Sequence, residues 1–146
     1  MNFAAERQAI VARLLANWAT TPVRLENQPA NPADNLSNGY VALYIRSGEG
    51  RQVTLGVNPG LIFAGAILLH IFTPRTALNG DLTARGYADS LSTIFRLQQF
   101  QVTYLGQPSG ALACGVPSDI QGPMDDHEWY RWTLSCPYFR QLAHTT

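Results

Sequence analysis

Residues 61–72, LIFAGAILLHIF, form the longest apolar run of the chain. A run of this length is too short for a membrane-spanning helix, which needs about 20 residues. The run is rich in Ile, Leu and Phe, and it follows the turn signal Asn58-Pro59-Gly60, so it predicts a strand that is apolar on both faces. Such a strand lies at the centre of a sheet, covered on both sides by the chain itself or by a neighbouring subunit.

Two segments have the apolar spacing of amphipathic helices, residues 2–19 and a segment that begins at Asp81. Asn2 and Asp81 are suitable N-caps, and Glu6 falls in a first turn, where the helix dipole favours a carboxylate. The predicted buried stripes are Phe3, Ile10, Val11, Leu14, Leu15 and Trp18 in the first helix and Ala84, Tyr87, Ala88, Leu91, Ile94 and Phe95 in the second.

The remaining periodic segments predict strands. We expect a short strand near a sheet edge at 21–27, a β-hairpin of 40–46 and 51–57 around the loop SGEG, and strands at 100–106 and 129–140. Residues 28–38 and the Gly- and Pro-rich segment 107–127 are predicted connections. The element order is then α-β-β-β-β-α-β-β. This predicts a single α+β domain, 1–146, with two helices on a mostly antiparallel sheet.

The closing strand, WYRWTLSCPYFR, has a half-buried pattern. Alternation places Tyr130, Trp132, Leu134 and Cys136 on one face. Pro137 lacks the N–H of a sheet ladder, which confines it to an edge strand, a strand end or a bulge. Three further aromatic residues either complete the sheet or face a partner subunit, where aromatic residues and Arg are enriched: Trp129, Tyr138 and Phe139.

Composition favours an assembly protein over a nucleic-acid-binding one. The chain of 146 residues has a formal net charge of zero, which argues against a protein that grips nucleic acid through counterion release. It is 46% hydrophobic and only 14% charged, which is more apolar material than one small core needs. The two cysteines form no disulfide framework, and with no leader pattern the expected state is reduced thiols in the cytosol.

Few residues have the pattern of a chemical site. Asp125-Asp126-His127-Glu128 is the one metal-capable cluster, but consecutive side chains do not converge on one ion, so a solvated acidic turn is the main expectation. His70 is expected to be an imidazole satisfied by one hydrogen bond rather than a general base. Cys114, predicted in a loop, has only His127 or His144 as conceivable partners. No catalytic residue, metal ligand or cofactor site is therefore predicted, and a small α+β enzyme using His70 or Cys114 is the alternative from another class.

Several segments in order resemble one family. NWATTPVRLEN follows the first helix, YVALYIRSGEGRQVTLG and LLHIFTP come next, ADSLSTIF lies in the second helix, and WYRWTLSCPYFR closes the chain. Together they resemble the tail terminator, or tail completion, proteins of long-tailed bacteriophages and prophages, over residues 17–140. The matching positions are Trp18, Thr21, Pro22, Val23, Glu26, Asn27, 71–74, Ala88, Asp89, Trp129, Tyr130, Pro137, Tyr138, Phe139 and Arg140. RTALNGD after IFTP and the long 107–127 connection depart from the family pattern.

The resemblance implies a structural protein that forms a closed ring, usually of six copies, on the head-proximal end of the tail tube. Such a ring stops tube polymerisation and presents a surface to the head-side connector protein, while DNA passes through its lumen without specific binding. It implies a virion protein assembled in the bacterial cytoplasm, with no membrane partner. A head-side neck or connector-completion protein is the alternative within the same machinery.

Two groups of residues are predicted to contact the tube or a neighbouring subunit. The first is the set Arg46, Glu49 and Arg51, on and beside the predicted hairpin tip, for which a solvated tip without a partner is the alternative. The second lies at the closing strand: Trp129, Pro137, Tyr138, Phe139 and Arg140.

Overall fold

The computed structural model describes residues 3–29, 31–52, 60–75, 80–119, 124–126 and 128–143. The elements in order are α1 (Phe3–Asn17), β1 (Val23–Leu25), β2 (Tyr40–Gln52), β3 (Gly60–Pro74), α2 (Gly80–Phe95), β4 (Gln99–Tyr104), β5 (Gln107–Cys114), β6 (Ser118–Asp119), β7 (Met124–Asp126) and β8 (Trp129–Ala143). The α+β class is confirmed. The predicted element order is wrong, because three described strands precede α2 and five follow it.

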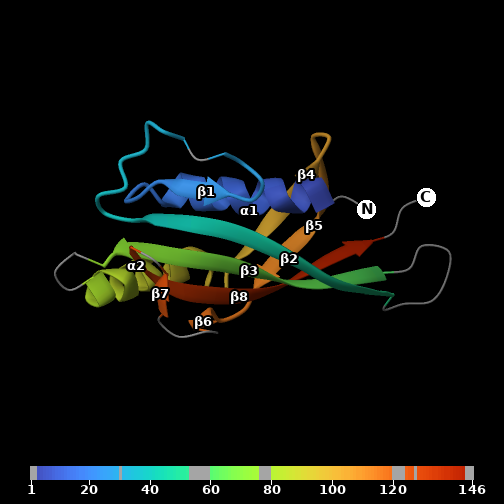
Figure 1. Ribbon diagram of the computed structural model, residues 1–146. Coiled ribbons are helices and arrows are strands. Elements are labelled where there is room, and N and C mark those ends of the chain that lie inside the picture. The colour runs from blue at the N-terminus through green and yellow to red at the C-terminus, as the bar shows by residue number, and fades with distance from the viewer. Residues whose placement is uncertain are drawn as a thin grey trace.

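The strands form one curled sheet in the order β1-β2-β3-β8-β5-β4, and β6 and β7 also pair with β8 (Figure 1). Among the described pairs, β1 with β2 is parallel and the others are antiparallel. β3 lies between β2 and β8, with Ile67 opposite both Ile45 and Cys136. The prediction that the apolar run is the central strand is therefore confirmed, and so is the short edge strand at β1.

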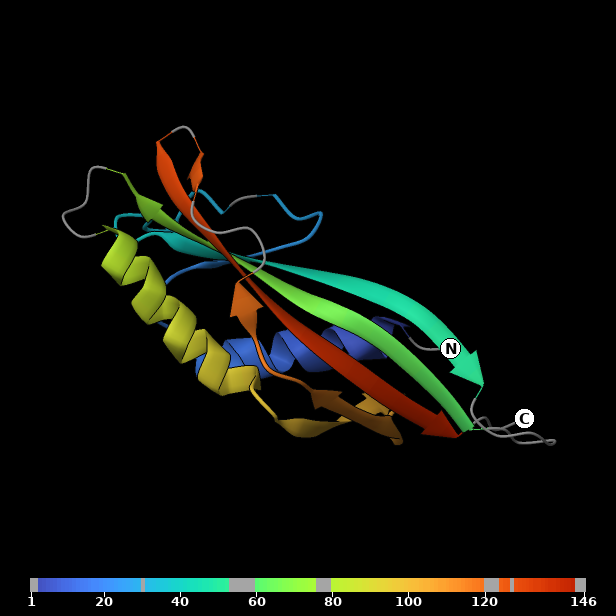
Figure 2. The same cartoon turned by 90° about the horizontal axis from the view of Figure 1, so that it is seen from below.

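Both helices cover the same face of the sheet (Figure 2). Beneath them, Ile67, Leu69 and Ile71 of β3 are fully buried, as strand alternation requires of one face. Trp18, just after α1, and Tyr87, in the middle of α2, form an edge-to-face pair with ring centroids 5.5 Å apart. No helix in the described part of the chain is long and apolar enough to cross a membrane.

The buried stripe of α1 differs from the predicted one. Phe3 and Leu15 are 50% and 53% exposed, whereas Glu6 is buried together with Ile10 and Leu14. These three residues follow one another at intervals of four, which places them on one helix face. The N-cap assigned to Asn2 lies outside the described residues, and Asp81 falls within the first turn of α2 instead of capping it.

The SGEG segment is not a hairpin loop. β2 continues through it, with a register shift between Ser47 and Gly50, and pairs with β3 as far as Gln52. The connection to β3 falls in residues 53–59, outside the described residues, as does the rest of the predicted strand 51–57. The long partner strand explains the difference, because ladder bonds along β3 outweigh the weak strand preference of two glycines.

The 107–127 connection is also corrected. Its first third forms β5, which pairs with β4 and with β8, and short stretches pair with β8 as β6 and β7. Cys114, predicted in a loop, ends β5. Proline and glycine indicated a loop, but the length of β8 offers an edge on which even short, irregular segments satisfy their backbone hydrogen bonds.

Pro137 lies in the middle of β8, opposite Ala66 of β3, rather than on an outer strand or at a strand end. On the other side of β8, β5 pairs from Tyr138 onward and β6 pairs at Ser135 and Leu134. The carbonyl of Pro137 accepts a bond from the Gly115 N–H at 2.7 Å, just beyond the end of β5. The N–H that Pro137 lacks would point to the place where β5 ends and β6 begins. No hydrogen bond of the sheet ladder is therefore lost there.

A buried polar cluster joins α1 to the sheet. The Glu6 carboxylate accepts hydrogen bonds from the hydroxyls of Tyr138 and Ser47, and its Oε2 lies 3.3 Å from Nε of Arg140. The side chains of Glu6 and Arg140 are 2% and 0% exposed. The Arg140 guanidinium also lies over the Phe63 ring, 5.4 Å from its centroid. We call Glu6, Ser47, Tyr138 and Arg140 the carboxylate cluster.

The backbone makes room for this cluster at one position of β3. Gly65 lies opposite Tyr138, and a Cβ atom at this position would overlap the Tyr138 phenol. The ring therefore lies directly over the β3 backbone. Burial of the hydroxyl beside a carboxylate raises the pKa of Tyr138 above its usual value, chiefly through desolvation and then through its bond to Glu6.

We predict a strong asymmetry between single and double substitutions in the carboxylate cluster. Arg140→Met leaves the Glu6 charge buried without its ion-pair partner and should lower the free energy of unfolding by about 3–5 kcal/mol. Adding Glu6→Leu removes that charge and should restore most of the loss. Denaturant unfolding of the wild type, the single variant and the double variant measures this. A double variant less stable than Arg140→Met would contradict the prediction.

Candidate interaction surface

Among the residues that the structure describes, the sheet face opposite the helices is covered at one end. There Tyr40, Ala42 and Phe72 are buried and pack against Leu36 and Trp129. Tyr40 stacks on Phe72 with centroids 4.5 Å apart and meets Trp129 edge-on at 5.2 Å. This cover of aromatic side chains closes one end of the face and leaves the rest of it accessible.

We call the remainder of this surface the open face. By alternation from the covered end it carries Tyr44, Arg46, Ala66, Leu68, His70, Ser135, Pro137 and Phe139. Tyr44 is 43% exposed and Phe139 54%. Most of these side chains are apolar or aromatic, and they lie on three adjacent strands. A contiguous exposed patch of this kind is typical of a protein–protein contact surface.

Six of the eight residues predicted to contact a partner are at least partly accessible. Arg46, Glu49 and Arg51 are exposed along the second half of β2, and Pro137 and Phe139 are exposed on the open face. Trp129 is half-buried against Tyr40. Their role in binding stays a prediction, and the structure divides them between the open face and the outer part of β2.

Tyr138 and Arg140 must be removed from that set. Both are buried inside the subunit as members of the carboxylate cluster. The sequence did contain a signal for this. Glu6 falls in phase with Ile10 and Leu14, and Arg140 falls in phase with Leu134 and Cys136, so each charge belongs to a buried face. Two opposite charges on buried faces imply an ion pair within the subunit.

Within the described part of the chain, His70 is oriented by one hydrogen bond, as predicted. Its Nδ1 lies 2.8 Å from Oγ1 of Thr133 on the neighbouring strand, and its ring meets Tyr44 edge-on at 5.1 Å. Partial burial lowers the pKa of His70 below its usual value, and the positive charge of Arg131 lowers it further. The imidazole is therefore neutral near pH 7, as part of the open face.

Cys114 belongs to the opposite side of the sheet. It is buried in the core beneath the helices, as is Cys136. A hydrogen bond from Cys136 lowers the pKa of Cys114, while the same contact and burial raise the pKa of Cys136. Because His70 and Cys114 lie on opposite faces of the sheet, they do not form a common site.

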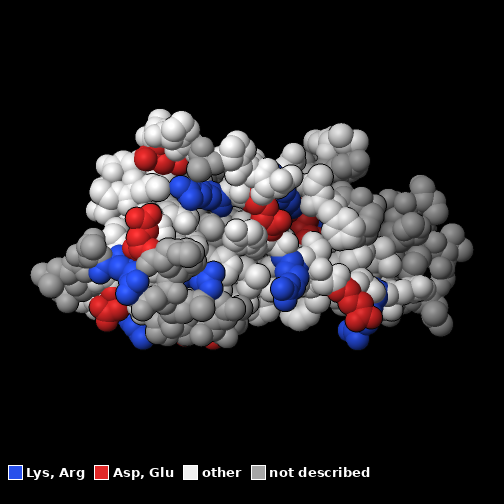
Figure 3. All heavy atoms as spheres, viewed as in Figure 1, with Lys and Arg blue, Asp and Glu red and all other residues white. Residues whose placement is uncertain are grey.

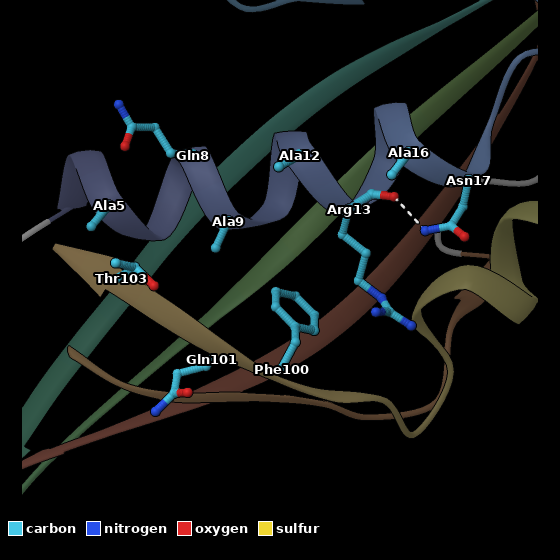
Figure 4. A pocket seen from close by; sticks show the side chains of 10 residues that line it. All are labelled: Ala5, Gln8, Ala9, Ala12, Arg13, Ala16, Asn17, Phe100, Gln101 and Thr103. Carbon is cyan, nitrogen blue, oxygen red and sulfur yellow. Dashed lines mark hydrogen bonds between the residues drawn. The ribbon is translucent and has the colours of Figure 1, made fainter. Parts of the chain in front are cut away.

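A groove runs between α1 and β4 (Figure 4). It has a volume of about 490 Å³ and is bordered on the helix side mainly by small side chains. Arg13 extends across it, donating from Nε to the Ile94 carbonyl at 2.9 Å and lying 5.1 Å from the Phe100 ring centroid. The lining residues are Ala5, Gln8, Ala9, Ala12, Arg13, Ala16, Asn17, Phe100, Gln101 and Thr103.

Charges on the surface are mixed. Figure 3 shows arginines and carboxylates interspersed over the visible face, without a large area of one sign. In the described part of the chain, no group of three or more His, Cys, Asp or Glu is placed to hold a metal ion. Asp125 and Asp126 lie in strand β7, opposite Tyr130 and Trp129, so the prediction that they form a turn is wrong. Their side chains and residue 127 lie outside the described residues, so the predicted exposure to solvent is not tested there.

Known proteins resemble this chain in fold only. No family model matches the chain. No curated protein matches it either. A solved structure whose name is a sequence identifier superposes over 96% of each chain, with a TM-score of 0.66 at 19% identity. That likeness supports the α+β architecture.

The depressed pKa of His70 predicts a pH dependence of stability. Because the folded-state pKa is below the unfolded value of about 6.5, the unfolded chain binds more protons as the pH falls, and stability is lost below about pH 6.5. In His70→Gln this contribution is absent. The free energy of unfolding of the wild type minus that of the variant should therefore be smaller at pH 5.5 than at pH 7.5. The contributions of the other titratable groups are the same in both proteins and cancel in this difference. A difference that stays constant or grows would contradict the prediction.

Proposed function

We propose that this protein is a tail terminator of a long-tailed bacteriophage or prophage. It acts as a structural subunit without catalytic activity, and six copies form a closed ring at the head-proximal end of the tail tube. The ring stops tube polymerisation and offers the surface to which the head-side connector binds. The order and spacing of the motifs between residues 17 and 140 support this family over a catalytic one.

The open face is the structural observation that carries the proposal. It leaves Tyr44, Phe139 and Pro137 in contact with solvent although the subunit already has a complete core beneath its helices. A ring is built from heterologous contacts, in which one patch of each copy meets a different patch of the next. An exposed apolar patch on one side of a small subunit supplies one half of such a contact.

The charge distribution also suits a ring through which DNA moves. A lumen with many arginines would bind phosphates, and the effect would multiply with the number of copies. A net charge of zero and interspersed signs avoid a trap of this kind. DNA can then slide through the ring during ejection without being held.

Loss of the gene tests the proposal most directly. Electron microscopy of lysates from a phage that lacks it should show overlong tails without heads, because nothing stops the tube or joins it to the head. Supplying the protein from a plasmid should restore tails of normal length with heads. Normal tails in its absence would overturn the proposed function, and normal-length tails without heads would favour a neck or connector protein.

A matched pair of surface variants tests the open face. Phe139→Ser should weaken ring assembly, since it removes an exposed aromatic side chain from the proposed contact, while the fold is kept because that side chain is 54% exposed. Leu82→Ser is the control, because Leu82 is 67% exposed on α2, on the other side of the sheet. Sedimentation of each variant over a concentration series gives the answer. Equal assembly of both variants would exclude Phe139 from the contact.

A further inference from the structure

The sheet has two outer edges that are open in the described structure. β1 pairs only with Val41–Leu43, so no described strand adjoins the outer side of β2 from Arg46 to Arg51. At the other end of the sheet, β4 pairs with β5 alone. The backbone N–H and C=O groups along such edges are a template for pairing with another chain.

The two edges differ in how they are protected. β4, with the sequence QFQVTY, has no charged residue, proline or glycine, although its register shifts between Gln101 and Thr103. Leu97 and Leu105, on either side of it, are 70% and 84% exposed. Natural proteins usually protect an edge of this kind with charges or a covering segment. β4 has no charged residue, and α1, which contacts it, leaves a groove beside it, so the edge can accept another strand.

The α1–β4 groove restricts what that strand can be. A strand added to β4 continues the sheet beneath α1, and every second side chain points towards the helix. There it meets Ala9, Ala12 and Ala16, with Arg13 as the one charged lining residue (Figure 4). The groove therefore suits an extended segment with small side chains and a carboxylate.

The outer part of β2 has this composition. Between Arg46 and Arg51 it reads Ser47-Gly48-Glu49-Gly50, and Glu49 is exposed. Both glycines are required within the subunit, because a Cβ at Gly48 would overlap the Ala64 carbonyl and one at Gly50 the Phe63 ring. The same absence of side chains leaves the outer backbone accessible. Pairing of this edge with itself is opposed by Arg46 and Arg51, since like charges on facing strands repel.

We propose that the outer edge of β4 and the α1–β4 groove receive the Ser47–Gly50 segment of a second copy, with Glu49 directed towards Arg13. The contact joins unlike edges of two copies, so it is heterologous and repeats around a closed ring. It rests on the proposed ring and identifies one of the interfaces between adjacent subunits. It also gives Glu49 a defined partner.

Disulfide trapping between copies tests this contact. A Glu49→Cys, Gln101→Cys double variant introduces two exposed thiols, while the native Cys114 and Cys136 are buried. Mild oxidation of the folded protein should yield a ladder of linked oligomers on a non-reducing gel, ending at the copy number of the ring. Each single variant should yield no species beyond a dimer. The matched control is Glu49→Cys, Ser90→Cys, in which Ser90 is exposed on α2.

The outcomes separate this contact from the proposed function. A ladder in the first variant and not in the control supports the β2–β4 contact. A ring mass in solution without the ladder overturns the contact and leaves the terminator proposal in place. Equal ladders in both variants show that the links form by random collision and overturn the contact. The absence of a ladder up to millimolar concentration overturns it as well. Normal tails in a phage that lacks the gene overturn the proposed function, whichever result the gel gives.

Discussion

One buried carboxylate fixes the arrangement of the subunit. Glu6 on α1 binds Ser47 of β2 and both Tyr138 and Arg140 of β8, while Phe63 of β3 lies under the guanidinium. A carboxylate taken out of water is tolerated only when its partners satisfy it. Because these partners come from β2 and β8, and the guanidinium also contacts β3, α1 has one position at which the charge is satisfied. The width of the α1–β4 groove follows from that position.

The cluster also explains the division of the closing strand between two surfaces. Tyr138 and Arg140 point towards α1, so alternation directs Pro137 and Phe139 to the other side. An aromatic-rich strand end thus contributes to the core and to the open face at the same time. If Arg140 were exposed instead, Phe139 would be buried and the open face would lose its most exposed aromatic side chain.

Local patterns allowed the helices, the central strand and the edge strand to be predicted from sequence. The apolar run around Ile67 and the stripe of α2 have a strong periodicity that tertiary contacts reinforce. The errors fall where a long partner strand overrides weak local preference. Gly48 and Gly50 indicated a turn, yet β2 continues along β3 through an irregularity that contains Gly48, and Gly50 pairs with Phe63. Gly110 likewise did not prevent β5 from pairing with β8. Pairing of this kind depends on residues far away in the sequence.

The candidate surface was predicted less well, and for a different reason. Aromatic residues and Arg are enriched both in cores and in interfaces, so residue type alone could not separate Tyr138 and Arg140 from Phe139. The position of each residue in the periodicity of its helix or strand could separate them. A charged residue that falls on the buried face needs a partner inside the subunit. Applying that rule to Glu6 would have assigned Arg140 to the interior from sequence alone.

The two open edges of the sheet differ in charge, and this difference limits which edges of two copies can pair. An edge that paired with itself would give two-fold dimers, and these would leave both outer surfaces exposed to further growth. Arg46 and Arg51 oppose that pairing on β2, whereas β4 has no charged residue to oppose a strand of another kind. Under the proposed contact, a chain with one protected and one receptive edge associates head to tail. In such an assembly, head-to-tail contacts close into a ring when the rotation between adjacent copies is a whole fraction of a turn.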